Sequence, residues 1–387
     1  MNTKQSRLET QSPLARLRQY GQSVWLDSIS RKLIDSGELA RMVKQDGLGG
    51  VTSNPSIFQK AIEGSADYAP EIARLSRDRQ LGAPQIFEQL ALKDIRDAAQ
   101  ILAPTYRDTQ GGDGYVSLEV APDLAHDTRG SVEAARRLWR ELDRPNVMIK
   151  VPGTAEGLPA VAQLLGEGIN VNVTLLFARS TYEHVAEIYL QALEQRAARG
   201  QPIERVASVA SFFVSRIDSA VDQLISSQLE QRSGADRSQL QALKGKAAIA
   251  NAKLAYQSYR RSFSGPRWQA LTAKGARPQR VLWASTGTKN PEYSDVLYVE
   301  ELIGPDTVNT MPQETLAAFR DHGQPRPSLE SGVEEARQLL ARLDQLGISL
   351  ERVTEELLKD GVLKFAQPYQ QLLASLARQL SAPPAHG

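Results

Sequence analysis

The sequence has 387 residues, 41% hydrophobic and 24% charged, which is the balance of a globular protein with a substantial core. Lysine and arginine total 46 against 45 acidic residues, so the net charge gives no reason to expect binding to nucleic acid or to an acidic membrane. The sequence lacks cysteine, which excludes disulfides, thiol nucleophiles, zinc–thiolate sites and iron–sulfur clusters.

The N-terminal segment, residues 1–21, is polar and lacks the apolar run of a secretory signal. No stretch approaches the roughly 18 consecutive apolar residues that span a bilayer. The four histidines are scattered, without the spacing of a metal site. We therefore expect a cytoplasmic protein that needs no cofactor and no metal ion and has no membrane partner.

Eight short apolar runs rich in β-branched residues predict strands. They are SVWLD from Ser23, GVTSN from Gly50, YVSLEV from Tyr115, VMIKVP from Val147, INVNVTLLF from Ile169, RVASVASFF from Arg205, RVLWAST from Arg280 and TVNTMP from Thr307. Segments of helical period lie between them, which favours parallel pairing through helical crossovers. Eight such units predict an α/β fold of the closed (β/α)8 TIM type.

An open doubly wound sheet is the alternative fold for the same alternation of strands and helices. Such sheets commonly carry a glycine-rich nucleotide-binding loop after a strand. Neither G-x-G-x-x-G after a predicted strand nor G-x-x-x-x-G-K-[ST] occurs in this sequence. The closed barrel is therefore the favoured fold.

The clearest predicted helix follows Phe177. Its apolar face consists of Tyr182, Val185, Ile188, Tyr189, Ala192 and Leu193. Ser180 and Glu183, three residues apart, predict a capping box at its start. A second helix is predicted from Arg216. Its apolar face consists of Ile217, Val221, Leu224, Ile225 and Leu229.

We expect residues 1–387 to form a single barrel domain, with the barrel at about 20–320 and additional helices at both termini. A C-terminal helical extension is expected at about 327–380. Three amphipathic stretches predict it: Val333 to Leu346, Leu350 to Phe365, and Tyr369 to Leu380. Residues 381–387 read as a frayed end.

Nearly every predicted strand ends in a polar residue. These residues are Asp27, Thr52, Asn54, Glu119, Lys150, Asn172, Thr174, Ser211 and Ser285. The carboxyl ends of the strands of a (β/α)8 barrel converge on one open face, where barrel enzymes build their active sites. The sequence therefore predicts a site that these side chains share.

Lys150 ends an apolar strand in the run MIKVPGT, just before a Pro-Gly turn. Burial favours the neutral form of a lysine amine, which can attack a carbonyl and form an iminium. The iminium accepts the electrons of an adjacent carbon–carbon bond, so that this bond can break. The alternative is a lysine that serves only as the ion-pair partner of Asp27 or Glu119.

Imine chemistry needs proton transfer at the carbinolamine oxygen and at the hydroxyl whose deprotonation drives cleavage. Asp27 and Glu119 offer two carboxylates for these roles, and the alternative for each is a structural counter-ion. We assign Thr174 to the water that Glu119 uses. Thr52 and the amides of Asn54 and Asn172 are assigned to the substrate, because an amide both donates and accepts hydrogen bonds.

A phosphate site is predicted where Ser211 ends a strand and Arg216 begins the next helix, because helix N-termini favour anions. The run ASTGTK adds Ser285 and Lys289 after the seventh strand. Barrels often bind phosphate at the loops after their last strands. The alternative is that Arg216 and Lys289 are ordinary solvated surface charges.

The motifs together resemble, in order, those of transaldolases, the cofactor-independent class I enzymes of the pentose phosphate pathway. They are WLDSIS around Asp27, GVTSNPSIF around Asn54, VSLEVAP around Glu119, MIKVPGT around Lys150, NVNVTLLF around Asn172 and Thr174, ASFFVSRID around Ser211 and Arg216, ANAKLAY from Ala250 and WASTGTKNP from Trp283. The resemblance covers roughly residues 24–319.

This resemblance implies a barrel whose lysine, here Lys150, takes dihydroxyacetone from sedoheptulose 7-phosphate and passes it to glyceraldehyde 3-phosphate. The products would be erythrose 4-phosphate and fructose 6-phosphate. Asp27 would be the acid and base of carbon–carbon cleavage, and Glu119, with the water on Thr174, would serve imine formation. By the same motifs, Asn54 and Asn172 would contact donor hydroxyls. Ser211, Arg216 and Ser285 would bind phosphate.

One position departs from the family pattern. Many transaldolases carry an arginine two residues after the serine that corresponds to Ser285, where this chain has Gly287. We assign that phosphate contact to Lys289. The length and the run ASTGTKNP resemble the longer bacterial branch of the family, some of whose members are fused to a phosphoglucose isomerase domain. This chain is too short for that fusion, so its tail is expected to be extra helix only.

Two alternatives remain open at this point. A fructose 6-phosphate aldolase would release free dihydroxyacetone, but such enzymes are shorter and typically carry glutamine where Glu119 stands. A non-catalytic sugar-phosphate-binding barrel would be expected to lack Lys150, Asp27 or Glu119, and all three are present. The expected partners are small sugar phosphates, and the chain is expected to be a monomer or a homodimer.

Overall fold

Eight parallel strands form a closed barrel in the computed structural model of the protein, which describes residues 12–230 and 234–381. The strands are β1 (Gln22–Leu26), β2 (Gly50–Thr52), β3 (Tyr115–Glu119), β4 (Val147–Pro152), β5 (Val171–Leu176), β6 (Ser208–Phe213), β7 (Arg280–Ala284) and β8 (Thr307–Met311). They follow one another in chain order, and β1 pairs with β8 to close the barrel. The predicted (β/α)8 fold is confirmed, and the open-sheet alternative is wrong.

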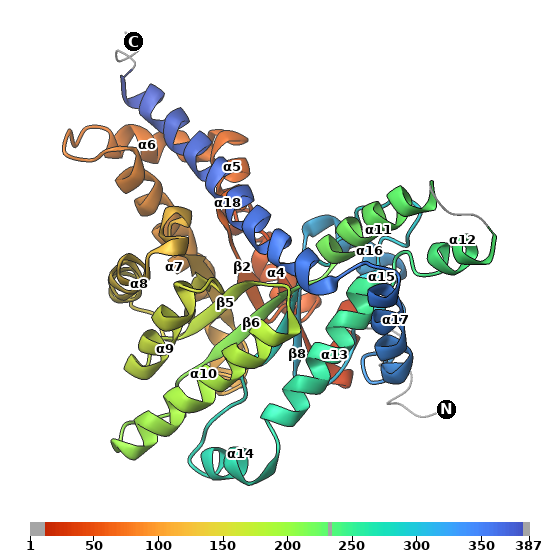
Figure 1. Ribbon diagram of the computed structural model, residues 1–387. Helices are drawn as coiled ribbons and strands as arrows, with labels where there is room; N and C mark the ends of the chain where they lie inside the picture. The colour runs from red at the N-terminus through yellow and green to blue at the C-terminus, as the bar shows by residue number, and fades with distance from the viewer. Residues whose placement is uncertain (1–11, 231–233, 382–387) are drawn as a thin grey trace, which may run out of the picture.

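Helices surround the barrel and connect its strands (Figure 1). From the N-terminal side to β5 they are α2 (Pro13–Arg16), η1 (Leu17–Tyr20), α3 (Arg31–Asp35), α4 (Glu38–Gln45), α5 (Pro55–Glu63), η2 (Ala66–Tyr68), α6 (Ala69–Leu75), α7 (Ala83–Asp108), η3 (Pro122–His126), α8 (Thr128–Leu142) and α9 (Gly157–Glu167). After β5 come α10 (Arg179–Ala198), α11 (Ser215–Leu229), α12 (Gly234–Gln241), α13 (Ala247–Ser262), α14 (Gly265–Thr272), α15 (Leu297–Glu300), α16 (Gln313–His322), α17 (Val333–Gln345) and α18 (Leu350–Ser381).

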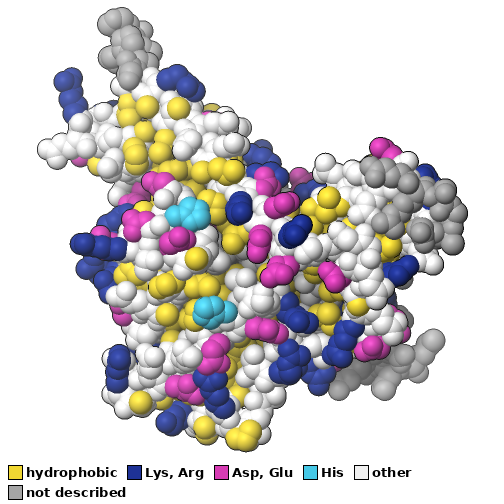
Figure 2. Space-filling view, in the orientation of Figure 1, with side chains coloured by type: hydrophobic (Ala, Val, Ile, Leu, Met, Phe, Trp, Pro, Cys, Tyr) yellow, Lys and Arg dark blue, Asp and Glu magenta, His cyan; other side chains and the backbone are white. Residues whose placement is uncertain are grey.

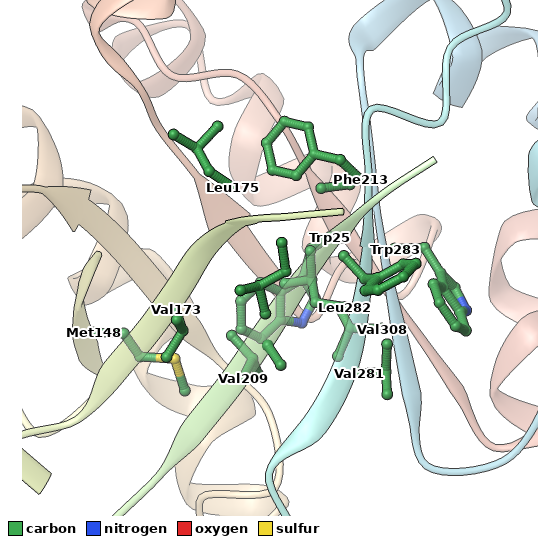
Figure 3. Close-up of a cluster of buried hydrophobic side chains, with 14 of the residues drawn as sticks. Trp25, Met148, Val173, Leu175, Val209, Phe213, Val281, Leu282, Trp283 and Val308 are labelled. Carbon is green, nitrogen blue, oxygen red and sulfur yellow. The ribbon is translucent and has the colours of Figure 1, made fainter. Parts of the chain in front are cut away.

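The strands are buried on both faces, one toward the barrel interior and one toward the surrounding helices. Strands in this position are nearly continuous apolar runs, which is why they could be recognised in the sequence. Figure 3 shows part of the apolar core, including Trp25, Met148 and Trp283. The packing is close at Gly50, where a Cβ atom would lie 2.5 Å from the Trp25 ring, so only glycine fits there.

The predicted capping box at the start of α10 is wrong. Ala178 occupies the N-cap position, and no side chain caps the helix there. Glu183 instead accepts hydrogen bonds from Ser258 (2.6 Å) and Arg261 (3.0 Å) of α13. The tertiary contact between α10 and α13 therefore replaces the local interaction with Ser180.

The predicted apolar face of α11 is correct at four of its five positions. Ile217, Val221, Ile225 and Leu229 are buried, whereas Leu224 is 43% exposed. Leu224 lies at the edge of the apolar stripe, outside the surface that neighbouring helices cover. Its assignment to the buried face is therefore wrong.

The C-terminal tail contains two helices, α17 and α18, rather than three. Helix α18 is continuous over 32 residues, and Pro368 lies inside it. It runs across the carboxyl end of the barrel in contact with β5, α5, α7, α11 and η3 (Figure 1). Residues 382–387, most of the predicted frayed end, and residues 1–11 lie outside the described residues.

The surface carries charges of both signs. Basic and acidic side chains are interspersed over the face that Figure 2 displays, as expected from 46 basic and 45 acidic residues in the sequence. Within residues 12–230 and 234–381, no helix is long and apolar enough to cross a membrane.

Candidate active site

A cavity of about 760 Å³ opens at the carboxyl ends of the strands. Eight of the eleven predicted site residues line it: Asp27, Thr52, Asn54, Lys150, Ser211, Arg216, Ser285 and Lys289. Glu119, Asn172 and Thr174 do not line it. Glu119 reaches Lys150 from β3, Asn172 contacts Ser211, and Thr174 is fully buried on β5.

Lys150 lies where the sheet register places it between two other predicted site residues. It is paired with Glu119 of β3 on one side and with Asn172 of β5 on the other. Paired residues of neighbouring strands point to the same face, so the three side chains meet. The Lys150 Nζ donates to the carbonyl of Ser53 at 3.1 Å and lies 3.4 Å from Glu119 Oε2. The ion pair of Lys150 with Glu119, which was the alternative explanation for this lysine, is therefore present in the structure.

Glu119 is an acid that can hold its proton near neutral pH. Its side chain is 4% exposed. Burial raises the pKa of Glu119 to about 7, and the attraction of Lys150 offsets only part of that rise. Within the described residues, Glu119 Oε2 is buried and makes no hydrogen bond beyond its 3.4 Å contact with Lys150 Nζ. This carboxyl can therefore give and take a proton beside the Lys150 amine.

This raised pKa predicts a pH-dependent stability. Below about pH 4.5, the ordinary value, Glu119 is protonated in both folded and unfolded chains. Between about pH 4.5 and 7 the unfolded chain loses this proton while the folded chain keeps it, so the free energy of unfolding falls, and above pH 7 the loss is complete. Glu119→Gln removes this cost. We expect the free energy of unfolding of the variant, relative to wild type, to rise by about 2 kcal/mol between pH 5 and pH 8. Urea unfolding at both pH values measures it, and a difference independent of pH would contradict the shift.

Asp27 approaches the cavity from the end of β1. Its Oδ1 accepts a hydrogen bond from Thr52 at 2.6 Å, and Thr52 Oγ1 also lies 2.7 Å from Thr310 Oγ1 on β8. Burial raises the pKa of Asp27, and the attraction of Lys150 and the Thr52 hydrogen bond offset only part of that rise. A carboxylate with a raised pKa is a stronger base than an exposed one.

Asn172 and Ser211 form a hydrogen-bonded pair beside Lys150. The Ser211 hydroxyl donates to Asn172 Oδ1 at 2.6 Å, and Asn172 Nδ2 donates to Ser117 Oγ at 3.1 Å. Thr174 differs, because its buried Oγ1 has no hydrogen-bond partner among the described residues. A buried hydroxyl of this kind is a natural anchor for a water molecule.

Arg216 is a largely desolvated cation at the start of α11. Its Cζ lies 5.2 Å from the centre of the Phe213 ring and 5.9 Å from that of Phe365. Burial lowers the pKa of Arg216 from its ordinary value. Within residues 12–230 and 234–381, its Nη1 is buried without a hydrogen-bond partner. An arginine in this state is suited to bind an anion.

The loop after β7 brings Ser285 to the N-terminus of α11, where Arg216 also lies. Ser285 Oγ lies 2.9 Å from Ser215 Oγ, and the Ser215 N–H donates to the Ser285 carbonyl at 3.0 Å. Ser285 has a φ of 56°, which is uncommon outside glycine and asparagine. Lys289 is exposed and borders the cavity. The hydroxyls of Ser215 and Ser285 thus lie with Arg216 at the N-terminus of α11, and Lys289 lines the same cavity.

Comparison with known proteins matches this chain to one family over most of its length. The family model described as Transaldolase/Fructose-6-phosphate aldolase matches residues 24–376. A protein of Thiobacillus denitrificans named "Transaldolase" is 51% identical over 356 residues, which is 92% of this chain and 97% of that protein. A "Transaldolase 2" of a Nostoc species is 50% identical over 371 residues, covering 94% of this chain and 96% of its own length. The chain belongs to the transaldolase/fructose-6-phosphate aldolase family.

The resemblance inferred from the motifs is therefore confirmed at the level of the family. A further member, named "Transaldolase" from Trichodesmium erythraeum, is 47% identical over 371 residues. These matches extend through the C-terminal helices, since the family model ends at residue 376, within α18. The C-terminal extension thus belongs to the part that the family shares.

The candidate site also contains residues that the sequence pattern did not indicate. Thr310 lines the cavity from β8 and contacts Thr52. It could have been found, because it is a polar residue near a strand end like those that were identified. Phe365 lines the cavity from α18, so the tail is not merely extra helix. No local pattern distinguishes Phe365 from the other apolar residues of an amphipathic helix.

Proposed function

We propose that this protein is a transaldolase that works through a Schiff base on Lys150. In this proposal it moves dihydroxyacetone from sedoheptulose 7-phosphate to glyceraldehyde 3-phosphate. The observation that carries the proposal is the position of the Lys150 Nζ, at the cavity and 3.4 Å from the Glu119 carboxyl. A buried amine beside a carboxyl with a raised pKa is an arrangement suited to imine chemistry.

Imine formation begins when the neutral Lys150 amine attacks the ketone carbon of the donor. The resulting carbinolamine loses its hydroxyl as water, and protonated Glu119 supplies the proton that this departure needs. A carboxyl whose pKa is about 7 is partly protonated at neutral pH and suits that step. Thr174 holds the water through its Oγ1, which has no hydrogen-bond partner among the described residues.

Carbon–carbon cleavage uses the second carboxyl. Asp27 takes the proton of the hydroxyl next to the bond that breaks, and the electron pair of that bond moves into the iminium to give an enamine. The aldehyde product, erythrose 4-phosphate, then leaves. Transfer reverses these steps: the enamine carbon attacks the new aldehyde, Asp27 returns the proton to the new hydroxyl, and hydrolysis of the iminium releases fructose 6-phosphate.

Asparagine and hydroxyl groups orient the donor in this scheme. The Asn54 Oδ1 caps α5 by accepting from the Ile57 N–H at 3.0 Å, so its amide NH₂ is the group left for a substrate hydroxyl. Asn172 acts together with Ser211, to which it is already hydrogen-bonded. Thr52 fixes the Asp27 carboxylate. Arg216, Ser285 and Lys289 hold the phosphate at the N-terminus of α11.

Arg216→Ala is expected to lower kcat/KM for phosphorylated donors about 30- to 100-fold, mainly by raising KM. A buried charged hydrogen bond contributes roughly 2–3 kcal/mol to binding. An unphosphorylated donor has no phosphate to accept this bond from Arg216, so its kinetics should not change. Steady-state kinetics with fructose 6-phosphate and fructose measure the difference. Arg129→Ala, at an arginine that is 89% exposed and paired with Glu133, is the control. Equal losses for both donors in Arg216→Ala would overturn the phosphate assignment.

The proposed function is tested by a coupled assay of erythrose 4-phosphate from sedoheptulose 7-phosphate, with and without glyceraldehyde 3-phosphate. We expect turnover that depends on the acceptor. Equal release of dihydroxyacetone in its absence would favour a fructose 6-phosphate aldolase. Binding of sugar phosphate without any turnover would favour a non-catalytic barrel.

A further inference from the structure

Helix α18 places an aromatic ring close to both Lys150 and Arg216 of the candidate site. Phe365 is buried, lines the cavity, and has its ring centre 5.6 Å from Lys150 Nζ. The same ring centre lies 5.9 Å from the Cζ of Arg216. Both separations are within the range of cation–π attraction. The C-terminal helix therefore contributes a wall directly over the amine that is proposed to react.

The position of Phe365 is fixed by contacts one turn away on either side. A Cβ atom at Gly361 would lie 3.0 Å from Leu175 Cδ2, so the helix approaches β5 closely at that point. Leu175 itself has a φ of 60°, where β5 shifts register against β6. In Figure 3, Leu175 and Phe213 lie apart from the other labelled side chains. On the other side, the Tyr369 ring packs edge-on against Phe87, with ring centres 5.5 Å apart.

We infer that Phe365 determines the fate of the three-carbon unit, favouring its transfer to an aldehyde over its release to water. The inference rests on the transaldolase function proposed above. After cleavage the enamine has two fates. It can attack an aldehyde carbon, or it can take a proton on carbon, after which water adds to the iminium carbon and the C–N bond breaks to give dihydroxyacetone and free amine. An apolar ring over the nitrogen excludes water from the second route and stabilises the cation.

The test compares Phe365→Ala and Phe365→Leu with Leu363→Ala. Leu363 lies on the same helix but is 59% exposed, so its variant controls for changes in α18 alone. The measured quantity is the ratio of dihydroxyacetone released to fructose 6-phosphate formed, at fixed sedoheptulose 7-phosphate and glyceraldehyde 3-phosphate. We expect this ratio to rise about tenfold in Phe365→Ala, less in Phe365→Leu, and not at all in Leu363→Ala.

One further measurement separates the inference from the proposed function. Borohydride reduction of wild type with donor must modify Lys150; if it does not, the proposed function fails and the inference falls with it. If wild type is modified and Phe365→Ala and Phe365→Leu keep the wild-type ratio, the inference alone is overturned.

Discussion

Lys150→Met is expected to lower kcat/KM for sedoheptulose 7-phosphate by at least ~10⁴-fold, the scale of loss seen when a covalent nucleophile is removed. Methionine preserves most of the side-chain volume at a buried position, so the fold should tolerate it. It cannot form the imine, and among the described residues no lysine other than Lys150 forms an ion pair with Glu119. The coupled assay for erythrose 4-phosphate measures the loss.

Lys253→Met is the matched control for this experiment. Lys253 is also a buried lysine, but it hydrogen-bonds the Ser331 carbonyl at 3.0 Å and lies 3.8 Å from Glu301, away from the cavity. We expect that variant to keep the kcat of wild type. Substantial turnover by folded Lys150→Met would show that Lys150 is only an ion-pair partner.

Asp27→Asn is expected to lower kcat by about 10²- to 10⁴-fold while leaving imine formation intact, because a general base contributes on this scale. The amide keeps an acceptor for the Thr52 hydroxyl but cannot take the substrate proton. The covalent intermediate should therefore accumulate before carbon–carbon cleavage. Single-turnover kinetics with borohydride quenching separate the two steps.

Asp113→Asn provides the control for a buried carboxyl outside the cavity. Asp113 Oδ1 accepts from Trp25 Nε1 at 2.7 Å and lies near Arg280, so the substitution tests stability rather than chemistry. We expect it to change the unfolding midpoint and not the cleavage rate. If Asp27→Asn abolished imine formation, Asp27 would act in imine formation rather than in carbon–carbon cleavage, which would contradict its proposed role.

The barrel could be predicted because its strands are short, buried on both faces and separated by helical segments. All eight strands occur where the sequence indicated them, although β6 begins at Ser208 rather than at Arg205. Details that depend on tertiary contacts could not be predicted. Ser180 does not cap α10, because Glu183 bonds to α13, and Pro368 does not end α18.

The strand-end rule located the candidate site, since six of the nine residues that it indicated line one cavity. It could not show that Ser211 and Asn172 bond to each other, which depends on the register of β5 against β6. It also could not find Phe365, because that residue reaches the site through the path of a helix beyond the barrel. Contributions of this kind are invisible to local patterns.

The most direct measurement is borohydride reduction of the wild-type protein in the presence of fructose 6-phosphate, followed by peptide mapping by mass spectrometry. The proposed mechanism predicts one modified peptide, carrying a reduced dihydroxyacetone or hexose adduct on Lys150, and no adduct in Lys150→Met. Modification of another lysine such as Lys289, or turnover without any trapped adduct, would contradict the Schiff base on Lys150.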